Sequence, residues 1–116
     1  MPFDNALFTI PILTGLIFVM VGIIMLKFPP KKINGLYGYR TSNSMKNKER
    51  WSFAQKYSAK EFIKLGFLLA LSGLIGLFIH PSENIATFMG LGLMTTAVIL
   101  LIVRVEKAIK ERFGDH

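Results

Sequence analysis

Three long stretches of the chain lack Asp, Glu, Lys and Arg altogether and are rich in Leu, Ile, Phe and Gly. They are Asn5–Leu26, Leu65–Ser82 and Asn84–Val103. A helix of about 20 apolar residues is long enough to cross the ~30 Å hydrocarbon core of a bilayer. The pattern therefore predicts three transmembrane helices, at about residues 6–28, 62–80 and 85–103.

Two other readings of the first stretch are disfavoured. A soluble helical bundle would carry a polar stripe along each helix, and no such stripe runs through residues 7–26 or 85–103. A cleaved signal peptide would need a basic start and a small-residue cleavage site. The chain has Asp4 before this stretch and Phe28, Pro29 and Pro30 after it. We therefore expect residues 1–116 to form a single three-span membrane domain.

The segment between the first two spans contains a further helical pattern. Residues 45–65 have no Gly or Pro and follow a group of N-cap residues. On a helical wheel Trp51, Ala54, Gln55 and Ser58 fall on one side, opposite several charged residues. This pattern predicts an amphipathic interfacial helix at about residues 45–60, anchored in the membrane interface by Trp51. It leaves open whether this helix bends into the second span or continues straight into it.

Small residues mark one face of each of the last two spans. The candidate packing residues are Gly66, Ala70, Gly73, Gly76, Ala86 and Gly90. Small side chains let membrane helices approach closely, and the short turn at residues 80–84 makes these two spans an antiparallel hairpin. We expect packing within the hairpin, with a homodimer interface as the alternative.

The charge distribution predicts the orientation in the membrane. The 116 residues carry a net charge of +7, with 14 Lys and Arg. Ten of these lie in residues 27–64 and the other four follow Val103. The positive-inside rule then places loop 27–64 and the C-terminus in the cytoplasm of a bacterial cell, with the N-terminus outside. Anionic lipid headgroups are the expected partner of this basic loop, rather than nucleic acid.

The sequence offers little chemistry for catalysis or metal binding. It has no Cys and two His, His80 and His116, so we expect no metal site and no cofactor. Nucleophile and phosphate-loop motifs are absent from the sequence, and we expect no catalytic residues and no enzyme. A pH-sensing role for His80 and an oligomeric pore lined by Thr14, Ser72 or Thr95 stay open.

One motif in the basic loop carries a resemblance. Gly38-Tyr39-Arg40-Thr41 is followed by Trp51-x-x-Ala54 ahead of a membrane hairpin. This arrangement resembles the signature of the SdpI/YfhL family of small bacterial membrane proteins, whose larger members carry extra spans. The resemblance implies immunity against a secreted antimicrobial peptide toxin, and for some members signalling to a cytoplasmic regulator. The alternative is a small membrane scaffold or signalling subunit whose basic loop docks a partner protein or anionic lipid.

The candidate functional residues lie in this loop and at the start of the following helix. They are Asn34, Gly35, Gly38, Arg40, Thr41 and Trp51. We expect Gly35 and Gly38 to provide positive φ angles or close backbone approach. Arg40 is expected to bridge phosphate headgroups, Glu61 or helix carbonyls.

Overall fold

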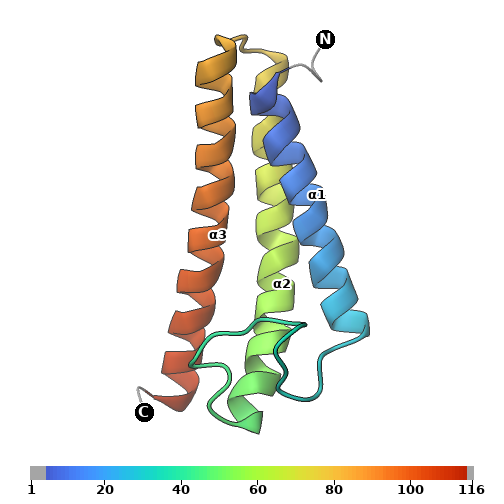
Figure 1. Cartoon of the computed structure of the whole chain (residues 1–116), viewed down its shortest axis with the longest axis vertical. Helices are drawn as coiled ribbons and strands as arrows, with labels where there is room; N and C mark the ends of the chain where they lie inside the picture. The colour runs from blue at the N-terminus through green and yellow to red at the C-terminus, as the bar shows by residue number, and fades with distance from the viewer. Residues whose placement is uncertain (1–4, 115–116) are drawn as a thin grey trace.

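The computed structural model describes residues 5–114 as three helices that run side by side (Figure 1). They are α1 (Ala6–Lys27), α2 (Lys48–Gly73) and α3 (Glu83–Phe113), with a 3-10 turn, η2 (Leu74–Leu77), directly after α2. The bundle measures 48 × 27 × 21 Å, and residues 5–114 contain no strand. The expectations about Asp4 and His116 fall outside these residues.

The first helix has nearly the expected bounds, and its start is bound to the segment that follows α2. The Asn5 side chain caps α1 by accepting a hydrogen bond from the Leu7 N–H at 3.0 Å. Its amide also donates to the carbonyls of Gly76 (3.0 Å) and Ile79 (3.1 Å). Asn5 therefore joins the start of α1 to the residues that follow α2.

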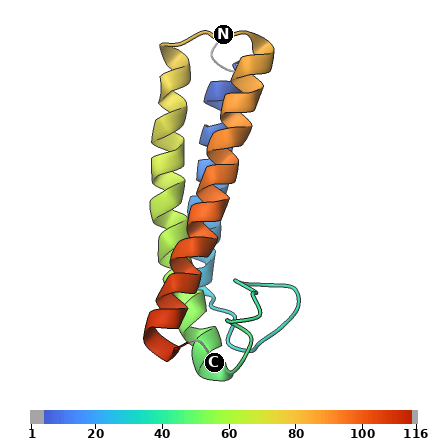
Figure 2. The same cartoon turned by 90° about the vertical axis from the view of Figure 1, so that its left-hand side faces the viewer.

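The second helix answers the question of continuity that the sequence left open. Residues 48–73 form one helix without interruption (Figure 2), so the interfacial helix predicted at 45–60 is the first half of α2 and not a separate element. Trp51 and Ala54 on its apolar face are fully buried in the protein and do not face lipid. The α-helical part of the predicted 62–80 span ends at Gly73, because the chain tightens there into η2.

The small residues of α2 and η2 face α1. The expectation that they pack against the third helix, within the hairpin, is therefore wrong. A Cβ added to Gly66 would lie 2.7 Å from the Gly15 carbonyl oxygen, and one added to Gly76 would lie 2.7 Å from the Phe8 backbone nitrogen. A Cβ added to Gly15 would lie 3.0 Å from the Cβ of Ala70, and Gly73 lies against Phe8 and Ile12. On α3, Gly90 lies against Ala6 and Ile10, and Ala86 is buried. The small size of these residues lets α1 approach closely.

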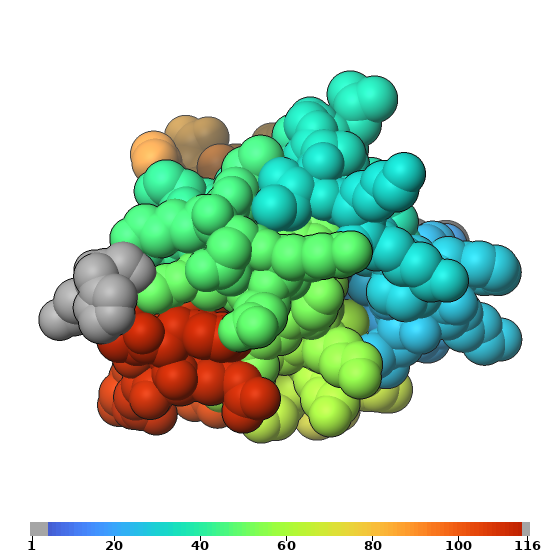
Figure 3. Space-filling view, turned by 90° about the horizontal axis from the view of Figure 1, so that it is seen from below, coloured from blue at the N-terminus to red at the C-terminus, as the bar shows by residue number. Residues whose placement is uncertain are grey.

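The third helix continues well past the predicted end of its span at residue 103. At 31 residues α3 is about 46 Å long, whereas α1 has 22 residues and is about 33 Å long. The start of α2 and the end of α3 therefore extend beyond Lys27. Residues 28–47 lie beside the start of α2, and the end of α3 stays uncovered in the view from below (Figures 1 and 3).

The outer surface of the helices is apolar. Large side chains such as Met20 (60% exposed), Phe67 (59%) and Phe88 (77%) point away from the bundle. Of the described helices, α1 and α3 are long and apolar enough to cross a membrane. Exposed apolar area of this extent is unfavourable in water and favourable in lipid. The surface therefore indicates a membrane protein.

Candidate functional site: the loop docked on α2 and α3

The segment that follows α1 is held against α2 by a glutamine. Gln55 is 2% exposed. Its Oε1 accepts a hydrogen bond from the Tyr39 N–H, and its Nε2 donates to the Tyr39 carbonyl, each at 2.7 Å. Gln55 thus satisfies both polar groups of one buried peptide residue, which fixes the path of the loop across α2.

Trp51 provides a second anchor one turn earlier on α2. Its indole N–H donates to the Pro30 carbonyl, and the side chain is fully buried. The expectation that Trp51 anchors the helix in the membrane interface is therefore wrong. A tryptophan on a modestly amphipathic helix can lie in the membrane interface or inside the protein. Here the loop covers Trp51 and places it inside the protein.

The buried position of Trp51 predicts a fluorescence result, because Trp51 is the one tryptophan of the chain. In mild detergent its emission is expected to resist the water-soluble quencher acrylamide. A control with Trp51→Phe and Phe28→Trp moves the indole to a position that is 70% exposed. The Stern–Volmer constant should be several-fold larger in the control, and equal constants would contradict the docked loop.

A carboxylate on α3 gathers the polar side chains of the loop. Oε2 of Glu106 accepts hydrogen bonds from the Tyr39 hydroxyl at 2.7 Å and the Thr41 hydroxyl at 2.9 Å. Oε1 accepts from the Asn43 amide at 2.9 Å. Burial and the neighbouring Glu106 raise the pKa of Tyr39 above its ordinary value, so the phenol keeps its proton and remains a donor.

Glu106 is the part of the site that the sequence did not reveal. From the sequence it is one member of an i,i+4 pair with Lys110 on an exposed helix end. Val105 and Ile109, which flank it, are fully buried. An acidic residue between apolar residues at helical spacing is the signal that could have pointed to a covered carboxylate.

The turn at residues 34–40 is built by Asn34, Gly38 and Arg40. Oδ1 of Asn34 accepts from the Leu36 N–H (2.9 Å) and the Tyr37 N–H (2.7 Å), which is an Asx turn. Gly38 has φ 104°, a conformation that favours glycine. A Cβ there would lie 2.7 Å from Pro30.

The expectation for Gly35 is wrong, and one of the three partners expected for Arg40, Glu61, is not the one observed. Gly35 has no positive φ, and a Cβ added to it would meet no atom within 4 Å, because it lies at an open corner. Arg40 donates to the Gly35 carbonyl and not to Glu61. Glu61 pairs instead with Arg104, at 3.0 Å across the α2–α3 contact, and with Lys64 of its own helix at 3.7 Å.

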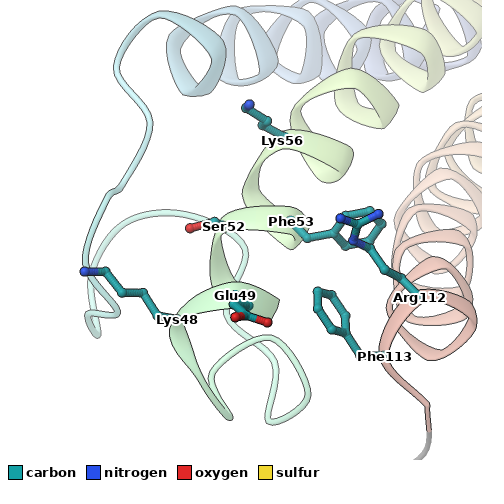
Figure 4. Close-up of a pocket in the computed structure, with 7 residues that line it drawn as sticks. All are labelled: Lys48, Glu49, Ser52, Phe53, Lys56, Arg112 and Phe113. Carbon is teal, nitrogen blue, oxygen red and sulfur yellow. The ribbon is translucent and has the colours of Figure 1, made fainter.

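A second surface lies where α2 begins and α3 ends (Figure 4). It is an open groove of about 660 Å³ with a basic and aromatic lining: Lys48, Glu49, Ser52, Phe53, Lys56, Arg112 and Phe113. The rings of Phe53 and Phe113 meet edge to face at 5.7 Å, and the Arg112 guanidinium lies over the Phe53 ring at 5.3 Å. Such a lining suits an acidic or aromatic partner. Within residues 5–114 no group of three His, Asp or Glu side chains could hold a metal ion.

Comparisons with known proteins agree with the loop motif. An uncharacterized protein of Bacillus subtilis, YfhL, is 42% identical over 67 residues, which cover 54% of this chain and 61% of that protein. No solved structure matches the chain. The sequence model of the SdpI/YfhL protein family matches residues 31–105, the region that contains the docked loop, α2 and most of α3. The chain therefore belongs to the SdpI/YfhL protein family.

Proposed function

We propose that this protein crosses the bacterial plasma membrane three times and protects the cell from a secreted, membrane-active peptide toxin. The observation that carries the proposal is the family match over residues 31–105. The matched relative is uncharacterized, and the chain spans about three-fifths of its length. The immunity role is therefore our inference from the family.

The third span of this proposal is the apolar half of α2 together with η2. Phe67, Leu68 and Leu71 are each more than half exposed, as side chains that face lipid would be. The lysines of residues 27–64 would then lie beside the inner leaflet, in agreement with the positive-inside rule.

Cysteine labelling tests the orientation, because the chain has no Cys. Ser82 and Ser42 are both exposed, whereas Ser44 is fully buried and unsuitable. In intact cells an impermeant maleimide should label Ser82→Cys, and it should label Ser42→Cys only after the membrane is opened. The reverse pattern would overturn the proposed orientation.

The docked loop is the main folded surface outside the apolar helix faces, and we assign protection to it together with those faces. The apolar faces could bind the toxin inside the membrane, while the loop could block or alter what the toxin needs. Arg40 is exposed on this loop, so it is available to a phosphate or to a partner.

Survival of a toxin-sensitive strain tests the immunity function. Cells that express the protein should survive a secreted membrane-active peptide toxin better than cells with an empty vector. Arg40→Ala should reduce survival at unchanged membrane levels, whereas Lys46→Ala, another exposed basic residue of the loop, should not. No protection by wild-type protein that is present in the membrane would contradict immunity to that toxin.

The groove between Phe53 and Phe113 supports a second candidate function, a scaffold or signalling subunit that docks a cytoplasmic partner. Phe113 lies nine positions after Arg104 on α3, a rise of about 14 Å, so the groove would lie beyond the lipid headgroups. Affinity purification in mild detergent should retain a partner that is lost in Arg112→Ala. A wild-type preparation without any partner would contradict this function.

A further inference from the structure

A hollow lies between α1 and α3 on the side of the loop. The two helices meet at Gly90, which lies against Ala6 and Ile10, and they diverge toward the loop (Figure 1). The hollow has a volume of about 400 Å³, within the ~300–1,000 Å³ range of small-molecule sites. Residues 37–41 of the loop contribute to its wall.

The lining of this hollow is apolar except for one rim. Phe18 and Phe62 meet edge to face at 5.2 Å. Together with Leu101 they form its inner wall, in which Phe18 and Leu101 are buried and Phe62 is partly buried. Val98 and Ile102 line it from α3 and are 38% and 43% exposed. The hollow is thus continuous with the apolar outer surface of α3, which faces lipid in a membrane protein.

The rim carries a positive charge. Arg40 lines the hollow from the loop and is exposed. Its guanidinium donates one hydrogen bond to the Gly35 carbonyl, and a guanidinium has five N–H donors. The neighbouring carboxylate, Glu106, already accepts hydrogen bonds from Tyr39, Thr41 and Asn43. An apolar cavity beside a guanidinium matches the two parts of a phospholipid, its acyl chain and its phosphate.

We propose that the hollow between α1 and α3 is a binding site for one anionic phospholipid, whose acyl chain lies against Phe18 and Phe62 and whose phosphate binds Arg40. The site lies where α1 ends and the loop begins, at the level at which headgroups meet hydrocarbon in a three-span arrangement. This inference goes beyond toxin immunity and depends only on the membrane placement of the helices. A lipid in this position would fill the gap that α1 and α3 leave.

Native mass spectrometry tests the site. The protein in mild detergent is mixed with equimolar phosphatidylglycerol and diacylglycerol that carry the same acyl chains. One phosphatidylglycerol should remain bound, in about tenfold preference to diacylglycerol, as expected for about 1.4 kcal/mol from a charge-assisted contact. Arg40→Gln should abolish this preference.

Two matched variants test the position of the acyl chain. Val98→Phe fills the hollow and should lower the bound fraction about tenfold, whereas Val103→Phe makes the same change at an exposed position of α3 outside the lining. Equal lipid retention by both variants would overturn the site and indicate general surface lipid. Equal binding of the two lipids by the wild-type protein would overturn the phosphate contact. Neither readout depends on protection from a toxin, so the lipid site can fail while immunity holds.

Discussion

Gly66→Ala is expected to destabilise the protein by about 2 kcal/mol, although alanine is the better helix former. The new Cβ would lie 2.7 Å from the Gly15 carbonyl oxygen and 2.9 Å from the Phe18 Cβ. Neither atom can move without shifting α1 as a whole. Thermal unfolding in detergent, followed by the fluorescence of Trp51, should show a clear fall in Tm.

The matched control for this variant is Gly92→Ala. A Cβ at Gly92 meets no atom within 4 Å. The substitution should leave Tm unchanged or raise it, because alanine stabilises a helix by up to about 1 kcal/mol relative to glycine. If Gly66→Ala were as stable as Gly92→Ala, the close approach of α1 and α2 would be contradicted.

Glu106→Ala is expected to release the loop while the three helices stay folded. The Tyr39 and Thr41 hydroxyls and the Asn43 amide would each lose an acceptor. Hydrogen bonds to a charged group contribute about 1.5–3 kcal/mol each, and part of this is regained from water. A net loss of about 2 kcal/mol would make loop opening about thirtyfold more frequent.

Limited trypsin digestion measures this opening, because Arg40 and Lys46 lie within the loop and become cleavable when it detaches. The initial cleavage rate in the loop should rise about thirtyfold in Glu106→Ala. Glu111→Ala removes an exposed carboxylate from the same helix and serves as the control, with a rate close to that of the wild type. Equal rates in the two variants would show that Glu106 does not hold the loop.

The family and the apolar helices could be predicted from the sequence because both depend on local pattern. Charge-free stretches of about 20 residues identify helices that belong in lipid, and α1 begins at Ala6 and ends at Lys27, close to the predicted 6–28. The Gly38–Thr41 and Trp51–Ala54 motifs gave the family, which the match to residues 31–105 confirms.

The environment of each loop residue could not be predicted in the same way. A tryptophan and a glutamine on one side of a helix fit equally well against lipid headgroups and against another segment of the chain. The structure places Trp51 and Gln55 against Pro30 and Tyr39, which are 21 and 16 residues away. Such long-range pairs leave no periodic signal in a single sequence.

The sequence by itself therefore determined an apolar helical protein, its family and the concentration of basic charge in one loop and one tail. Tertiary structure decided that α2 is one continuous helix, that its glycines face α1, and that Glu106 holds the loop. The physical reason is distance along the chain. Hydrophobic spacing acts over one or two helical turns, whereas helix partners and hydrogen bonds across more than 60 residues, such as Tyr39 to Glu106, depend on how the three helices pack together.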